Sequence, residues 1–449
     1  MVLQGCKRRF ETVMVSEERG GNLIGDKQFI NTEESTSTLF SPLLELPVHI
    51  LCDILSRLPL MNILRCKCVC KMFLKLVKDP YFSKVHLARA PTLTTNLVLQ
   101  ENIGKWGALH FFTFDLSEST LSSCSSADQD TPSYLNRGLP MLSKLNADFS
   151  FRTQRLTLVG SCNGLLCLYF DSSSRPFYGI TNPILGECIK LPQLTLSAPH
   201  CTYANHSGFG YCPRTKQYKI ISFMHLTSVD PLNSTDSKRM VADVHTLGSD
   251  SWRRIENPPC PNRTSFDPFL NGCLHWITNS NRPSELITSF DLEKEKFRVV
   301  PPPAHFNVQY MNKVSWINIG VLRGCLCICY IYEDAEFEVW VMREYGVKES
   351  WSKEFSIDMK FYCKLRVEDL HRPIKFFSNG DLWFISSSES LVSFSPQKRT
   401  FRELRSMGPW KTEVTAHALS FISLKGVVGA DSLQVKNLLI GGRRFILGI

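Results

Sequence analysis

Apolar residues follow two different patterns along this chain, and the first has the period of a helix. Between residues 46 and 58 the apolar positions form two adjacent rows that recur every four residues. The rows are Ile50, Ile54 and Leu58 in one, and Leu51 and Leu55 in the other. This spacing predicts a helix of about three turns with a wide apolar stripe. Pro47 and Pro59 each stand where a helix can begin, because the first helical turn tolerates a missing N–H.

Two more short helices are predicted before residue 88. Their apolar positions are Ile63 and Leu64 in one, and Val69, Phe73, Leu76 and Val77 in the other, which ends before Pro80. Three helices in about forty residues cannot bury this much apolar surface among themselves. The segment is therefore either a cap packed on the rest of the chain or a docking module whose stripe is covered by another protein's helices.

From about residue 107 the pattern changes to apolar runs of four to eight residues separated by Gly, Pro, Asn and Asp, which is typical of an all-β domain. One phrase recurs within it. Asn-Gly followed by an apolar run begins at Asn163, Asn271 and Asn379, 108 residues apart each time. Weaker versions near residues 217 and 323 halve the period to about 54. Each phrase predicts a tight turn that leads into a strand.

A second phrase, a strand followed by a polar turn and another strand, comes after each first phrase. A repeat of about fifty residues with four short strands indicates the blade of a β-propeller. Five units are clear, and a sixth, near residues 108–158, is degenerate. A last strand from His417 to Leu424 is predicted to pair with the first unit and close a ring of six or seven blades. The alternative is a two-sheet sandwich with coincidental spacing.

The helical segment resembles the F-box motif in its plant form. The resemblance rests on Leu46-Pro47, Ile50, Ile54-Leu55, Arg57-Leu58-Pro59, Ile63-Leu64-Arg65-Cys66-Lys67, Val69-Cys70-Lys71, Pro80, Phe82 and His86-Leu87. Phe73 departs from it, since the family usually has Trp there. The resemblance implies binding to a Skp-type adaptor, and through it to a cullin–RING ubiquitin ligase. The implied adaptor-binding residues are Leu46, Pro47, Ile50, Ile54, Leu55, Leu58, Pro59, Ile63, Leu64, Arg65 and Val69.

The β region resembles the F-box-associated domain of plant F-box proteins, which is kelch-like in plan. The match spans about residues 155–405, and its phrases include Gly160-Ser-Cys-Asn-Gly-Leu-Leu-Cys, Asn182-Pro183, Ser251-Trp-Arg-Arg-Ile and Asn379-Gly-Asp-Leu-Trp. The Gly-Gly pairs of true kelch repeats are absent. In this family the domain captures the protein to be ubiquitinated. The implied function is the non-catalytic substrate-recognition subunit of an SCF-type (Skp–cullin–F-box) ubiquitin ligase, with an unknown protein client.

Two other functions stay open at this point. One is an adaptor-bound scaffold without ligase clients. The other is a propeller lectin or enzyme in which the helical segment is decorative.

The predicted fold class is α+β multidomain, with a short three-helix F-box followed by an all-β kelch-like propeller. Residues 1–40 are polar and aperiodic and are predicted to be disordered. The F-box takes residues 41–88, a linker strand 89–106, and the propeller-like domain 107–425. Residues 426–449 are predicted to be a final strand or a tail.

Composition narrows the functional classes further. The 449 residues carry a net charge of +9, but no run of Lys and Arg exceeds three residues, so nucleic acid is not expected as a partner. No eighteen consecutive residues are apolar, and the first residues have no continuous apolar core, so neither a membrane span nor a secretory signal is expected. The 17 cysteines are then most simply reduced thiols of an intracellular protein, in the cytoplasm, the nucleus or both.

The sequence contains no phosphate-binding loop, nucleophile elbow or zinc-protease motif, so no catalytic, cofactor or metal residue is expected. Cys66, Cys68 and Cys70 do not form a convincing metal set, because residues two apart on a helix point to different faces. Another set of thiols, Cys325, Cys327 and Cys329, alternates along a predicted strand and is expected to line one packed face. Two histidines, His275 and His417, are interpreted as packed or loop residues.

Overall fold

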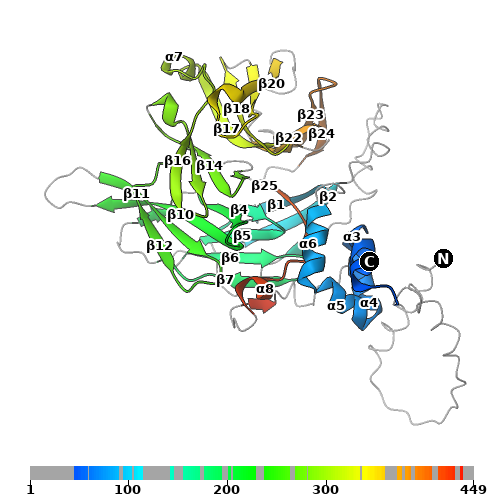
Figure 1. Ribbon diagram of the computed structural model, residues 1–449. Coiled ribbons are helices and arrows are strands. Elements are labelled where there is room, and N and C mark those ends of the chain that lie inside the picture. The colour runs from blue at the N-terminus through cyan, green and yellow to red at the C-terminus, as the bar shows by residue number, and fades with distance from the viewer. Residues whose placement is uncertain are drawn as a thin grey trace, which may run out of the picture. The chain divides into compact units, whose positions relative to one another are not determined.

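The computed structural model describes residues 45–58, 60–89, 95–103, 106–114, 142–145, 155–171, 176–194, 201–203, 206–228, 237–262, 268–280, 282–333, 336–358, 372–376, 380–385, 390–406, 413–429 and 435–437. The chain divides into two compact units, Met1–Arg89 and Ala90–Ile449. The first is helical and the second is built mainly of strands (Figure 1). The segment 1–40, predicted to be disordered, lies outside the described residues.

The described part of the first unit contains α3 (Val48–Ser56), α4 (Leu60–Val69), α5 (Lys71–Val77) and α6 (Pro80–Arg89). α3 starts directly after Pro47, whose carbonyl accepts hydrogen bonds from the N–H groups of Ile50 (2.9 Å) and Leu51 (3.1 Å). The core of this unit, among its described residues, consists of Leu51, Cys52, Leu55, Ile63, Leu64, Phe73, Leu76, Val77 and Phe82. Phe73 is therefore a packed core residue despite replacing the usual Trp.

The predicted three-helix arrangement is wrong in two places. Val69 ends α4 and does not belong to the next helix, because Cys70 is extended (φ −152°, ψ 162°) and separates α4 from α5. Pro80 begins a fourth helix, since its fixed φ suits the first helical position.

Asp53 joins the beginning and the end of the helical unit. Its carboxylate is paired with Arg57 one turn later (2.9 Å) and with Arg89 at the end of α6. Arg89 also donates to the backbone carbonyl of Asp53 (3.1 Å) and to the Ser56 hydroxyl. Hydrogen bonds from Arg57 and Arg89 lower the pKa of Asp53 to about 2, so this link stays charged at neutral pH.

Six antiparallel sheets make up the described part of the second unit, and five of them contain runs of consecutive strands. The first two are β4–β7 (Arg155–Cys162, Leu165–Asp171, Phe177–Asn182, Glu187–Lys190) and β8–β12 (Cys201–Tyr203, Gly208–Cys212, Gln217–Ser228, Ser237–Thr246, Trp252–Glu256). The next two are β13–β16 (Phe269–Leu270, Cys273–Ile277, Ile287–Asp291, Lys296–Val300) and β17–β20 (Val314–Leu322, Cys325–Tyr332, Glu336–Met342, Trp351–Asp358). The fifth is β21–β24 (Arg372–Phe376, Leu382–Ile385, Ser390–Ser395, Thr400–Ser406).

The remaining sheet has the order β25-β1-β2-β3 and joins two distant parts of the chain. It consists of β1 (Thr95–Ile103), β2 (Trp106–Phe114), β3 (Leu142–Leu145) and β25 (Glu413–His417). The segment 89–106, predicted to be a linker strand, contains β1, which is a strand of this composite sheet. The short helices in the described part of this unit are η4 (Pro283–Glu285), α7 (Val308–Met311), η5 (Lys348–Ser350) and α8 (Leu424–Val428).

Contacts between strands of neighbouring sheets arrange the six sheets in a ring. β4 contacts β9, β9 contacts β14, β14 contacts β17, β17 contacts β21, β21 contacts β25, and β25 contacts β4. The series returns to its start, so the unit is a β-propeller and the predicted fold class is confirmed. The predicted six or seven blades are too many: five sheets are blades of consecutive strands, and the composite sheet completes the ring.

Tight turns join the first two strands of the blades at the predicted Asn-Gly phrases. Both residues of Asn163-Gly164 have positive φ (51° and 82°), as the common two-residue hairpin turn requires. The same conformation occurs at Asn271-Gly272 and Arg323-Gly324. Asn379 lies outside the described residues, but Gly380 beside it also has a positive φ of 86°.

The ring is closed by β25, which pairs with β1 in antiparallel register from Asn96↔His417 to Gln100↔Glu413. The predicted closing strand, His417–Leu424, is therefore misplaced, because the strand ends where it was expected to begin. Residues 418–423 have no regular structure, and α8 follows. Within the predicted C-terminal strand or tail, β26 (Val435–Asn437) pairs with β7.

Polar contacts fasten the segment after β25 to blade β4–β7. The Asn182 amide donates to the carbonyls of Ser420 (3.1 Å) and Ile422 (2.7 Å). The Glu187 carboxylate accepts hydrogen bonds from the Ser423 hydroxyl (2.9 Å) and the Leu424 N–H (2.6 Å). The C-terminal segment is thus held by side chains as well as by strand pairing.

A buried ion pair joins blades β8–β12 and β13–β16. The Lys219 ammonium, whose side chain is 5% exposed, donates to Glu295 (2.8 Å) and to the carbonyl of Leu292 (2.6 Å). Arg253 is paired with the same carboxylate. Burial raises the pKa of Glu295, but hydrogen bonds from Arg253 and Lys219 outweigh it, and the pKa lies below its usual value.

Candidate docking surface and client pocket

The structure places the predicted adaptor-binding residues at three levels of burial. Leu55, Ile63 and Leu64 are core residues, with exposed fractions of 4% or less. Leu46 and Leu58 are half-buried. The exposed residues are Pro47, Ile50, Ile54, Arg65 and Val69. Pro59 lies outside the described residues.

The helical period explains this division. Leu51 and Leu55 form the row of α3 that packs into the unit, whereas Ile50 and Ile54, one position earlier each time, are each 39% exposed. Val48, which the sequence analysis did not select, is 58% exposed at the first position of α3. Val48, Ile50, Ile54 and Val69 are called the exposed apolar residues of the F-box.

Exposed large apolar side chains are concentrated in the helical unit. Of the eight in the described part of the chain, five lie there, Tyr81 completing the set above. The much larger propeller has Val299, Val308 and Tyr345. Several exposed apolar residues in one small unit indicate an interaction surface more strongly than single exposed residues do. The helical unit is therefore the stronger candidate for a stable protein interface.

The three cysteines of β18 behave as packing residues. Cys327 and Cys329 are buried with Phe337 and Val339 in the core between blades β17–β20 and β21–β24, and Cys325 packs against this core, so the predicted shared face is confirmed. Among the residues that the structure describes, no three His, Cys, Asp or Glu side chains are grouped so that they could hold a metal ion.

The two histidines singled out in the sequence are buried. Nδ1 of His275 lies 3.0 Å from the carbonyl oxygen of Pro268, and its Nε2 lies 2.7 Å from the Tyr345 hydroxyl. Nδ1 of His417 lies 2.8 Å from the Ser161 hydroxyl, which joins β25 to β4. Burial lowers the pKa of His275 to about 4 and that of His417 to about 3. Both rings are neutral at pH 7 and serve packing between strands.

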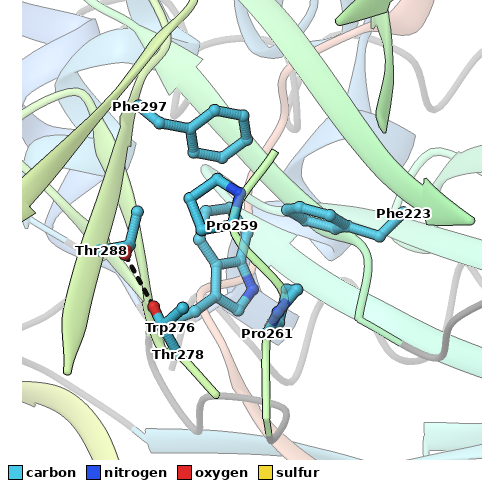
Figure 2. A pocket seen from close by; sticks show the side chains of 7 residues that line it. All are labelled: Phe223, Pro259, Pro261, Trp276, Thr278, Thr288 and Phe297. Atoms are coloured by element: carbon cyan, nitrogen blue, oxygen red, sulfur yellow. Dashed lines mark hydrogen bonds between the residues drawn. The ribbon is translucent and has the colours of Figure 1, made fainter. Parts of the chain in front are cut away.

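Pro259 and Pro261 pack between blades β8–β12 and β13–β16. Figure 2 shows Pro259 and Pro261, from the connection after β12, lying among Phe223 of one blade and Trp276 and Phe297 of the other. Pro261 also forms an isolated bridge with Thr278. The connection between the two blades is thereby fixed in place.

An open pocket with a volume of about 310 Å³ lies beside these prolines. It is lined by Asn257, Pro258, Pro259, Cys260, Thr278, Asn279, Ser280, Glu285, Thr288 and Val299. Within the lining, the hydroxyls of Thr278 and Thr288 are hydrogen-bonded (2.7 Å; Figure 2). Sequence reasoning missed this site, because its walls come from separate loops without a shared motif.

A helical unit with several exposed apolar side chains is followed by a β-propeller, an arrangement typical of modular binding proteins. Comparison with known families makes this specific. Residues 43–84 match the F-box domain, and residues 109–421 match the F-box associated beta propeller domain. The chain belongs to the plant F-box proteins with a C-terminal associated β-propeller domain.

Curated relatives from Arabidopsis thaliana agree with this assignment. The F-box protein At3g07870 is 26% identical over 396 residues, which cover 80% of this chain and 87% of the relative. The F-box protein CPR1 is 29% identical, with 70% and 73% covered. The F-box/kelch-repeat protein At3g23880 is 26% identical, with 72% and 82% covered.

Among solved structures, a six-bladed fungal lectin from Aleuria aurantia aligns with a TM-score of 0.30 and 10% identity, over 72% of this chain and 96% of the lectin. A prolyl endopeptidase aligns with a TM-score of 0.33 and 11% identity, over 86% of this chain and 55% of that chain. Within the described residues, no helix is both long enough and apolar enough to cross a membrane.

Proposed function

We propose that this chain is the substrate-recognition subunit of an SCF-type ubiquitin ligase. In this proposal the exposed apolar residues of the F-box dock on a Skp-type adaptor, and the propeller binds a protein client. The chain itself performs no bond chemistry. It raises the rate of ubiquitin transfer by holding a client lysine near the charged conjugating enzyme.

The observation that carries the proposal is the apolar exposure of α3. Val48, Ile50 and Ile54 lie within seven residues, and each exposes 39% or more of its surface to water. Burying the exposed part of one such side chain contributes about 1 kcal/mol, so the four exposed apolar residues contribute about 4 kcal/mol before the costs of association. They form the apolar centre of the proposed interface, and Arg65 and Pro47 add contacts beside it.

The test is co-purification of a plant Skp-type adaptor with the full chain and with the double variant Ile50→Asp, Ile54→Asp. Both side chains are already half in water, so the variant keeps the buried row of Leu51 and Leu55 and should fold. Placing two carboxylates in the interface removes about 2 kcal/mol of apolar burial and adds their desolvation cost. We expect adaptor binding to fall at least 100-fold.

Val308→Asp is the matched control, because Val308 is equally apolar and 58% exposed but belongs to α7 of the propeller. It should leave adaptor binding unchanged. Undiminished binding by the α3 double variant would refute the docking proposal. A second assay measures ubiquitination of a captured client in a reconstituted ligase. A substrate receptor should support this ubiquitination and the α3 double variant should not, whereas a scaffold without clients should support none.

A further inference from the structure

The two ends of the propeller offer different surfaces. In each antiparallel blade, the first and third connections lie at one end, and the second connection and the link to the next blade lie at the other. At the first end neighbouring charges are paired with each other. Arg214 is paired with Glu293 of the next blade (2.5 Å), and Arg323 and Arg343 share Glu354.

The open pocket lies at the other end. The connection after β12 forms one side of it, and the connection between β14 and β15 forms the other. Its volume of about 310 Å³ is at the lower limit of ligand pockets, which span roughly 300–1,000 Å³. This size suits one or two side chains of a protein better than a large ligand.

The walls of the pocket combine apolar and acidic chemistry. Pro258, Pro259 and Val299 supply an apolar side, and Val299 is 54% exposed. Glu285 is the only charged residue of the lining. The pocket therefore pairs an apolar wall with a single negative charge.

Glu285 is held in place by its neighbours. The Ser280 hydroxyl donates to one carboxylate oxygen (2.9 Å), and Arg282 is paired with the other (3.1 Å). Arg282 is 79% exposed, so its pair with Glu285 is a surface ion pair that water screens strongly. A partner's cation can share or replace it at small cost. Asn279, also in the lining, has no side-chain hydrogen bond to the described residues and adds a further acceptor.

We propose that this pocket receives a lysine or arginine side chain from an exposed segment of the protein client. The methylene stem would lie along Pro259 and Val299, and the cation would bind the carboxylate of Glu285 and the side-chain amide oxygen of Asn279. An acidic side chain would be repelled by Glu285, so the pocket gives the client a charge requirement. The inference rests on the proposed receptor function and specifies the chemistry that the propeller recognises.

The experiment selects binders for the full chain, purified with its adaptor, from a display library of random twelve-residue peptides. We expect the selected peptides to share a basic residue at one position. Affinities of individual peptides are then measured for the parent chain and for Glu285→Gln, Val299→Ser and Glu349→Gln. Glu349 is the control, because it is the acidic residue of another three-residue 3-10 helix, η5, at the opposite end.

Loss of a charge-assisted hydrogen bond predicts at least a tenfold weaker affinity for Glu285→Gln. Val299→Ser removes part of the apolar wall and should weaken the affinity for the selected peptides about threefold. Glu349→Gln should bind them like the parent. The proposal is overturned if no peptide is selected, if selected peptides lack a common basic residue, or if Glu285→Gln binds them undiminished. The adaptor that co-purifies with each variant reports on docking separately, so failure of the pocket is distinguished from failure of the receptor function.

Discussion

Removing the negative partner of Lys219 tests how the propeller blades are held together. The perturbation is Glu295→Gln, which keeps the size of the side chain and removes its charge. Lys219 then lies between blades β8–β12 and β13–β16 without its acidic partner, and only 5% of its side chain is exposed. The structure predicts a large loss of stability, because the stranded ammonium has lost its counter-charge in a place that water hardly reaches.

The size of the stability loss depends on the hydrogen bonds that Lys219 keeps in the variant. Removing one partner of a buried pair typically costs about 3–5 kcal/mol. The Leu292 carbonyl still accepts from the ammonium at 2.6 Å, and the amide oxygen introduced at position 295 remains an acceptor. These contacts place the expected loss near the lower limit, about 3 kcal/mol. For a unit of this size the melting temperature should fall by about 6 °C.

The chain contains a matched control for the same measurement. Lys313 and Glu333 form a pair of almost the same length (2.7 Å), but their side chains are 52% and 53% exposed. Glu333→Gln should cost less than about 1 kcal/mol, because water screens and replaces the interaction. Thermal unfolding and urea denaturation of the parent and both variants provide the comparison.

A third variant isolates the stranded charge. Adding Lys219→Met to Glu295→Gln should recover most of the stability, because an apolar chain of similar length no longer needs a partner. Equal destabilisation by Glu295→Gln and Glu333→Gln would refute the reasoning from burial. A Glu295→Gln variant as stable as the parent would show that this pair does not hold the two blades together.

Two further predictions concern acid sensitivity and turn geometry. Burial lowers the pKa of His245 and His275 to about 4 and that of His417 to about 3, so between pH 6.5 and 4 the unfolded chain binds protons that the folded propeller does not. The free energy of unfolding, measured by urea titration, should therefore decrease as the pH is lowered through this range, by up to about 1.4 kcal/mol per pH unit per histidine. Constant stability across the range would contradict this prediction. Gly164→Ala should lower the melting temperature at least twice as much as Gly324→Ala. Both variants strain a left-handed backbone, at a cost of about 1 kcal/mol, but only at Gly164 would the new methyl group also collide with Ser420. Equal shifts of the melting temperature would exclude that contact.

The sequence predicted elements whose signal is local. The Asn-Gly phrases required a left-handed pair of residues, and Asn163-Gly164 adopts it. The four-residue rows of α3 were equally informative about the helix itself. They did not reveal which row packs inward, since Ile50 and Ile54 are as apolar as Leu51 and Leu55, and only the placement of α4–α6 decides between them.

Features that depend on distant residues were missed or misplaced. The closing strand was expected at 417–424, but the pairing partner β1 lies at residues 95–103 and sets the true position at Glu413–His417. α8 has five residues, too few for a helical period to be seen in the sequence. The pocket combines Asn257, Glu285 and Val299, which become neighbours only when two blades pack together.

The composite sheet also imposes an order on biosynthesis. β1 emerges from the ribosome about 310 residues before β25, which at 5–20 residues per second is a delay of roughly 15–60 s. During that interval one edge of β1 lacks its native neighbour and is open to pairing with other nascent chains. A premature stop codon between the end of β1 and residue 413 would leave this edge permanently unprotected. Such products would expose an unpaired strand to aggregation and to quality control, even with all five consecutive blades complete.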